Sequence, residues 1–182
     1  MILYIHGFRS TAHSAKSVLI KEHFGEATHI ADFSHVPDQA IDDLEKIMAQ
    51  QTITGLMASS LGCFYATYLA EKYQLKAVLI NPSTRPYETL ERYLGKNETH
   101  DGLFFDWKRE HLTQLEQYCV EYPTVKNYAI FLKKGDSILD YKVAEQYYQG
   151  SQIWIEEGGT HSFEDFDKHL ESVDQFFNNN NY

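Results

Sequence analysis

Residues 54–63 read Thr-Gly-Leu-Met-Ala-Ser-Ser-Leu-Gly-Cys and pass from an apolar segment into a stretch with helical spacing. We expect a strand over residues 53–57 and a helix over residues 61–73, in which Tyr65 and Leu69 lie on one face. A strand that leads directly into a helix is the repeating unit of parallel sheets, whose strands need crossover connections. This segment therefore predicts an α/β fold.

The rest of the chain repeats this alternation of short apolar segments with helical ones. The helical segment 38–50, for example, places Ile41, Leu44 and Ile47 on one stripe. Because the strands are too apolar to have a face in water, we expect a compact doubly wound, mostly parallel sheet of about six strands with helices on both faces. The predicted strands are residues 2–5, 28–33, 53–57, 77–81, 128–132 and 152–155.

Length and charge narrow the class of protein. The 182 residues fit a single domain, and 16 basic against 26 acidic side chains leave a formal net charge of −10. This charge repels phosphate groups, so neither nucleic acid nor an anionic membrane is an expected partner. Cys63 and Cys119 have no disulfide-framework or zinc-site spacing, which fits a reducing compartment. With no basic signal-peptide region and no apolar run long enough to span a membrane, we expect a cytoplasmic location.

One connection is much longer than the others. Residues 83–126 separate two predicted strands and carry many aromatic side chains. A structureless loop of this length is uncommon in a compact domain, so we expect a helical cap over one end of the sheet. Extra packing for stability and a functional lid both remain open as its role. Residues 178–182, rich in asparagine, are predicted to form a frayed tail.

Ala58-Ser59-Ser60-Leu61-Gly62 follows a small-x-Ser-x-Gly pattern between the central strand and its helix. In such a turn the serine is strained and exposed, and the small residues on either side let strand and helix approach each other. Ser60 is therefore predicted to be a nucleophile. A pattern this relaxed also arises by chance, and the alternative is that Ser59 or Ser60 only caps the helix.

The first strand ends in Tyr4-Ile5-His6-Gly7-Phe8, and a polar loop follows. Acyl transfer develops negative charge on an oxygen, and a His-Gly loop after a strand is typical of the α/β-hydrolase segment that supplies one backbone N–H to it. We predict that the N–H groups of Phe8 and Leu61 form this oxyanion hole, since Leu61 also begins a helix. His6 is better placed to brace the loop than to act as a base.

A serine nucleophile needs a base and an orienting carboxylate, which this fold supplies in the order Ser, Asp/Glu, His. Asp136 follows the strand 128–132, and His161 follows a pair of glycines after the strand 152–155. Both positions are at carboxyl ends of strands, where ligands bind in open α/β sheets. We predict Asp136 as the acid and His161 as the base, with Asp140 as an alternative acid.

These motifs resemble those of the small bacterial esterases of the YqiA type, in the α/β-hydrolase superfamily, over nearly the whole chain. The resemblance implies an α/β-hydrolase fold and an esterase with the triad Ser60, Asp136 and His161, acting on acyl esters or thioesters. Ala58 departs from the family pattern, which has glycine there, and Arg9 replaces a smaller polar residue. The segments that carry the resemblance are residues 3–8, 14–16, 59–62, 80–82, 85–86, 135–136, 139–141 and 158–163.

The chemistry of a serine triad needs no metal or other cofactor, so none is expected. The substrate is predicted to be an acyl ester, with an acyl thioester of the acyl-CoA type as the alternative, because both pass through the same acyl-serine. A non-catalytic binding protein with this fold is the alternative from another class.

Two further predictions concern substrate contacts. Arg85 follows the strand 77–81 and is predicted near the pocket mouth, where it could bind an anionic group; a salt bridge to Glu88 is the alternative. The apolar wall of the acyl site is predicted to consist of Phe104, Phe105 and Trp107.

Overall fold

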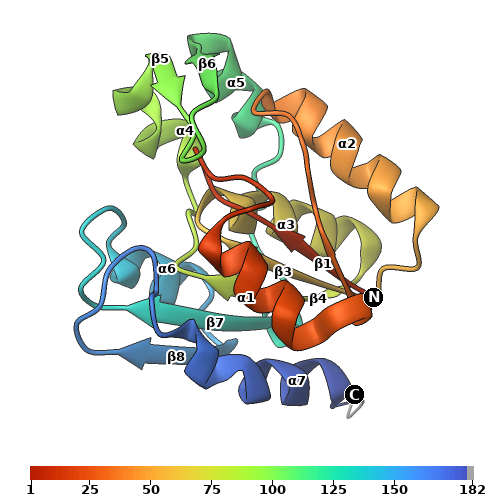
Figure 1. The fold of residues 1–182 in the computed structure, drawn as a ribbon. Coiled ribbons are helices and arrows are strands. Elements are labelled where there is room, and N and C mark those ends of the chain that lie inside the picture. The colour runs from red at the N-terminus through yellow and green to blue at the C-terminus, as the bar shows by residue number, and fades with distance from the viewer. Residues whose placement is uncertain (180–182) are drawn as a thin grey trace.

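The computed structural model describes residues 1–179 and contains a six-stranded sheet with helices on both faces (Figure 1). All neighbouring strands are parallel, in the order β2-β1-β3-β4-β7-β8, so the predicted doubly wound α/β fold is confirmed. The order reverses between β1 and β3, and in such sheets the crevice at the reversal is where ligands bind. The strands are β1 (Ile2–Ile5), β2 (Thr28–Ile30), β3 (Gly55–Ser59), β4 (Lys76–Ile80), β7 (Tyr128–Lys133) and β8 (Gln152–Glu156).

Of the six predicted strands only β1 has the predicted bounds, and the differences at β3 and β2 bear on the site. Strand β3 continues to Ser59, so that the residue after the strand is Ser60. Strand β2 ends at Ile30 rather than Phe33, because its only neighbour, β1, is four residues long and pairs with it no further than Tyr4↔Ile30. Phe33 therefore lies in the loop after β2 and not in the sheet.

Alternate side chains of the strands supply two apolar clusters, one on each face. Leu3 and Ile5 of β1 belong to the cluster that is covered by α2 and α3, whereas Ile2 and Tyr4 belong to the cluster covered by α1 and α7. The helices beside the sheet are α1 (Ala15–Phe24), α2 (Pro37–Gln50), α3 (Leu61–Tyr73), α6 (Tyr141–Tyr147) and α7 (Leu170–Asn178).

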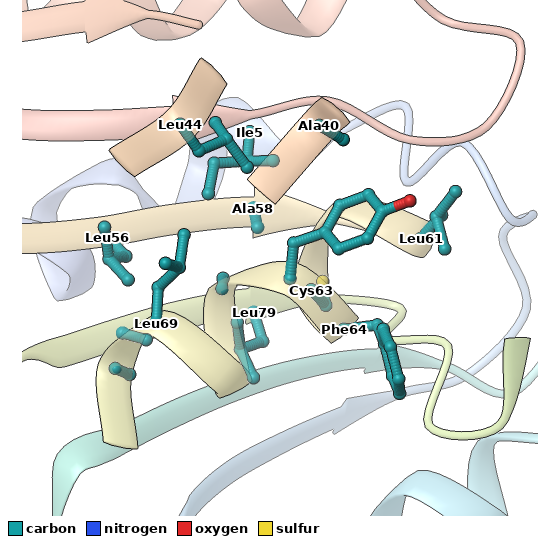
Figure 2. Packing of buried hydrophobic residues seen from close by; sticks show 14 of the residues in the cluster. Ile5, Ala40, Leu44, Leu56, Ala58, Leu61, Cys63, Phe64, Leu69 and Leu79 are labelled. Atoms are coloured by element: carbon teal, nitrogen blue, oxygen red, sulfur yellow. The ribbon is translucent and has the colours of Figure 1, made fainter. Parts of the chain in front are cut away.

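Figure 2 shows the packing on the face covered by α2 and α3. Leu56 and Ala58 of β3 point toward α3, and Leu69 of that helix fills the space beside them. Leu44 of α2 lies next to Ile5 of β1. Because these side chains are almost completely buried, α3 is fixed against the centre of the sheet directly behind Ser60.

The sequence led us to expect a helical cap over residues 83–126, but this connection is not purely helical. It contains an antiparallel hairpin between two short helices, and the group lies at the top of Figure 1. Gly95 and Gly102 have φ of 108° and 90°, a region that favours glycine and interrupts a helix, which explains the hairpin. The elements are α4 (Pro86–Thr89), β5 (Gly95–Glu98), β6 (Phe104–Trp107) and α5 (Arg109–Glu116).

At the C-terminus, Asn178 is the last residue of α7 rather than part of a frayed tail. Asn179 ends this helix, its N–H donating to Gln175 O at 3.0 Å, and residues 180–182 of the predicted tail lie outside the described residues. Within residues 1–179, no helix combines the length and apolar character needed to cross a bilayer.

The core of the α1 and α7 face makes a quantitative prediction. Phe131 of β7 is fully buried, stacks on Trp154 at 4.6 Å between ring centroids and meets the edge of Phe166 at 5.3 Å. We expect Phe131→Ala to lower the free energy of unfolding by about 3–5 kcal/mol, since the cavity it leaves cannot refill. Phe104→Ala is the matched control, because Phe104 is 78% exposed, and should stay within about 0.5 kcal/mol of the unsubstituted protein in urea unfolding. Equal losses in the two variants would contradict this account of the core.

Candidate active site

Three side chains from separate loops meet at the carboxyl edge of the sheet. Ser60 follows β3, Asp136 follows β7 and His161 follows β8. The Nε2 atom of His161 lies 2.8 Å from Ser60 Oγ, and its Nδ1 atom lies 2.6 Å from Asp136 Oδ2. The side chains predicted as nucleophile, base and acid thus form one continuous hydrogen-bonded chain. Such a chain can draw a proton from the serine hydroxyl.

The backbone at Ser60 is held in an unusual conformation. Its φ of 53° and ψ of −122° lie where residues other than glycine are rare. Its N–H donates to Ile80 O at 3.0 Å, and its carbonyl accepts from Ser83 N and Cys63 N, both at 3.1 Å. These bonds from the end of β4 and from α3 hold the strained turn, which presents Oγ to His161.

Two glycines permit the close packing around this turn. A Cβ atom on Gly62 would lie against the carbonyl oxygen of Ile5 and 2.5 Å from that of His6. A Cβ atom on Gly7 would lie 2.9 Å from the Ser60 Cβ. Ala58, where the resembling family has glycine, is fully buried, so its methyl group is accommodated in the core.

The two candidate acids have different surroundings. The side chain of Asp136 is 2% exposed, and its Oδ1 accepts hydrogen bonds from the N–H groups of Ile138 and Leu139 at 2.8 and 2.9 Å. These bonds fix the carboxylate with Oδ2 toward His161. Asp140 instead caps α6, accepting from Lys142 N at 3.0 Å. The geometry therefore favours Asp136 over Asp140 as the partner of the imidazole.

A cavity of about 360 Å³ opens next to Ser60. Leu61 and Phe8, whose N–H groups were predicted to form an oxyanion hole, both line it, as does Gly7, which packs against Ser60. The N–H of Leu61 stands at the start of α3, where helical N–H groups have no acceptor within the helix. The apolar part of the lining consists of Phe8, Phe33, Leu61, Tyr65, Leu103, Phe104 and Phe105.

Only some of the side chains predicted to contact the substrate lie at the cavity. Phe104 and Phe105 line the cavity, Phe104 being largely exposed. Trp107 does not line it, although it lies on the same face of β6 as Phe105: its ring is buried and packs against the rings of Phe8 and His111, at 5.0 and 4.9 Å between centroids. Arg85 does not line it either; this exposed side chain lies 3.9 Å from Glu88, the alternative that the sequence left open.

The loop after β1 is tied to the hairpin, which sequence reasoning did not detect. The guanidinium Nε of Arg9 donates to Glu98 O at 2.7 Å, and Arg9 O accepts from His100 N at 2.9 Å. The ring of Phe8 also packs against Phe105 at 5.6 Å. The hairpin therefore helps to place the Phe8 N–H.

His6 has the surroundings of a bracing residue. Its Nδ1–H donates to Gly7 O at 3.1 Å, and its ring stacks on Phe33 at 4.3 Å. Burial lowers its pKa and so favours the neutral ring. Cys63 is also unsuited to chemistry, because burial raises the pKa of its thiol well above the usual range. Residues 1–179 contain no group of three or more His, Cys, Asp or Glu side chains arranged to hold a metal ion.

The loop that carries His161 lies over a buried cation. Lys133, at the end of β7, pairs with Glu156 and with Asp165, the latter at 2.7 Å, and lies 4.5 Å from the centre of the Phe163 ring. The hydrogen bond from Lys133 holds the pKa of Asp165 far below its usual range, so this pair is charged. The pair joins β7 to the segment that follows His161.

The sequence model of the uncharacterised protein family UPF0227 matches residues 1–178. The chain belongs to this family. A UPF0227 protein of Vibrio campbellii is 22% identical over 187 residues, covering 98% of this chain and 99% of that protein. A UPF0227 protein of Citrobacter koseri is 22% identical over 188 residues, covering 97% and 98%.

Solved structures share the fold of this UPF0227 protein. Alpha/beta hydrolase domain-containing protein 10 from mouse gives a TM-score of 0.74 at 16% identity, covering 96% of this chain and 88% of that one. Est1E from Butyrivibrio proteoclasticus with ferulic acid bound gives 0.72 at 17%, covering 96% and 86%. The esterase domain of a Rhodothermus marinus protein gives 0.68 at 19%, covering 94% and 83%. The predicted α/β-hydrolase fold is therefore confirmed. The resemblance to YqiA-type esterases is consistent with this fold.

The packing at Gly62 predicts the effect of adding a methyl group there. We expect Gly62→Ala to destabilise the protein by about 3 kcal/mol or more and to displace Ser60, since the new atom meets backbone that cannot rotate away. Gly25→Ala is the control: Gly25 has φ of 53° but open space around it, so only the backbone strain of about 1 kcal/mol is expected. Thermal unfolding of both variants measures the difference. A Gly62→Ala protein as stable as the control would show that α3 can move away from β1.

Proposed function

We propose that this UPF0227 protein is a serine hydrolase that cleaves acyl esters through a Ser60–His161–Asp136 triad. The observation that supports the proposal most is the hydrogen-bonded chain from Asp136 through His161 to Ser60 Oγ, beside a cavity. The fold alone would not suffice, because one fold supports many functions. Solved relatives of the fold that are named as hydrolases and esterases add support of a general kind.

The proposed reaction begins with attack of Ser60 Oγ on the carbonyl carbon of the ester, while its proton passes to His161 Nε2. Negative charge on the former carbonyl oxygen is stabilised by the N–H groups of Phe8 and Leu61. The carboxylate of Asp136 holds the ring tautomer and stabilises the imidazolium. The C–O bond to the alcohol then breaks, and His161 gives its proton to the departing alkoxide.

The second half of the reaction releases the acid. Water attacks the carbonyl of the acyl-Ser60 and transfers a proton to His161, which passes it to Ser60 Oγ as the acyl–oxygen bond breaks. The products are the carboxylic acid and the alcohol, and Ser60 is regenerated. The apolar side chains of Phe104 and Phe105 are proposed to contact the apolar part of the substrate.

Removal of the proposed nucleophile is the first test. We expect Ser60→Ala to lower kcat for p-nitrophenyl acetate by about 10⁶-fold and to abolish labelling by a fluorophosphonate, because only an activated serine reacts. Ser59→Ala is the matched control: Ser59 Oγ hydrogen-bonds Tyr4 OH at 2.9 Å, away from the proposed chemistry. The circular dichroism of both variants should match that of the unsubstituted protein. An unlabelled wild-type protein, or a Ser60→Ala protein that keeps its activity, would refute the proposal.

The two aspartates allow a matched comparison of the proposed acid. We expect Asp136→Asn to lower kcat by about 10⁴-fold, since an amide favours the wrong tautomer of His161 and cannot stabilise its charged form. Asp140→Asn keeps an oxygen that can accept from Lys142 N, and asparagine caps a helix about as well as aspartate, so stability and kcat should both stay nearly unchanged. Steady-state kinetics on both variants, with melting temperatures, separate the two roles. The opposite ranking of kcat would assign the acid to Asp140.

A further inference from the structure

Asn81 lies at the end of β4 and makes contacts that its place in the sequence does not suggest. The residue is 3% exposed and has φ of 43°, a left-handed conformation that asparagine tolerates better than most residues. Its backbone N–H donates to Phe131 O at 2.9 Å, and its Oδ1 accepts from Lys133 N at 2.9 Å. Asn81 thus continues the pairing of β4 with β7 beyond the end of β4.

The amide nitrogen of Asn81 reaches the loop that carries the proposed base. Nδ2 donates to Thr160 O at 3.2 Å and to His161 O at 3.0 Å. A side-chain amide has two N–H donors and a carbonyl acceptor. In Asn81 both donors and the acceptor make a hydrogen bond. A buried amide satisfied in this way holds its partners in one relative position.

The loop around His161 has little regular structure of its own. His161 lies in a turn between β8 and the short helical segment Phe166–His169, and is preceded by Gly158 and Gly159 with φ of 65° and 69°. Beyond it, Lys16 of α1 donates to Phe163 O at 3.0 Å. Side chains from other elements therefore hold three carbonyl groups of the loop. Asn81 binds those of Thr160 and His161, and Thr160 O also accepts from Phe163 N at 3.1 Å within the loop.

We propose that Asn81 is a positioning residue for His161, holding the backbone of residues 160 and 161 so that Nε2 stays within hydrogen-bond distance of Ser60 Oγ. This inference rests on the proposed function, in which His161 is the base. Asn81 is not among the residues that line the cavity, and its side chain hydrogen-bonds to Thr160, His161 and Lys133, so its proposed effect on Ser60 passes through the backbone of His161. A displacement of about 1 Å in a catalytic group can cost about 100-fold in rate.

The test removes the amide without straining the backbone. Asn81→Gly suits the positive φ and deletes all side-chain contacts at once. Gln74→Gly is the matched control, because Gln74 also has a positive φ, of 55°, and its side-chain amide donates to a backbone carbonyl oxygen, that of Glu71 at 2.7 Å, at the end of α3. If Asn81→Gly fails to fold, Asn81→Asp is used in its place. This variant keeps the acceptor for Lys133 N and removes the N–H donors to Thr160 O and His161 O.

Two experiments are made on each variant. Steady-state kinetics with p-nitrophenyl acetate give kcat and KM, and labelling by a fluorophosphonate gives a rate constant for the reaction of Ser60. For Asn81→Gly we expect kcat and the labelling rate to fall together by about 10- to 100-fold, with KM within about 2-fold. Gln74→Gly should leave both rates within about 2-fold. Unchanged rates in Asn81→Gly, or equal losses in the control, would overturn the inference.

A double-substitution cycle with His161→Ala distinguishes positioning from general damage to the site. If Asn81 acts only through His161, adding Asn81→Gly to His161→Ala leaves the residual activity unchanged. Additive losses would show that Asn81 acts on Ser60 or on the fold, and would reject the inference while keeping the proposed function. A wild-type protein that neither hydrolyses the ester nor reacts with the fluorophosphonate would reject both.

Discussion

The close approach of the α3 N-terminus to the end of β1 is the constraint on which the site depends. It is possible because Gly62 presents no side chain to the carbonyl oxygens of Ile5 and His6. This packing forces the chain between β3 and α3 into the strained turn at Ser60, since the strand and helix leave no room for a longer connection. The same approach brings Leu61 and Phe8 into the lining of one cavity.

The parallel sheet then determines which loops can reach Ser60. Parallel strands present all their carboxyl ends at one edge, so the loops after β3, β7 and β8 meet there although their residues are far apart in sequence. Side chains at the ends of the intervening strands connect these loops. Asn81 links the end of β4 to β7 and to the His161 loop, and Lys133 links β7 to Asp165. The site is thus supported by buried polar contacts between loops as well as by the apolar core.

The hairpin of the connection 83–126 contributes both to the cavity and to the packing around the loop that carries Phe8. Phe104 and Phe105 contribute to the cavity, whereas Trp107 and Arg9 bind the hairpin to the loop that carries Phe8. A hairpin that moved as a whole would therefore pull on the Phe8 N–H. The insertion is in this sense part of the framework of the site and not only a cover over it.

The sequence by itself determined the features that depend on local backbone requirements. The alternation of strands and helices, the small residues around Ser60, and the placement of Asp136 and His161 just after strands all follow from periodicity and turn chemistry. These requirements act within a few residues, so they can be recognised without knowing the fold. They were enough to predict the doubly wound sheet and the three side chains that the structure brings together.

Only the tertiary structure decided which distant groups meet. Asp136 and Asp140 are four residues apart, and the distinction between them came from the direction of one carboxylate toward His161 and of the other toward the start of α6. The hairpin, the placement of Trp107 behind Phe8, and the reach of Asn81 to Thr160 and His161 were not predicted, because each depends on how separate elements pack. A side chain's local sequence limits its conformation, whereas its partners are set by contacts between segments that the chain brings together only on folding.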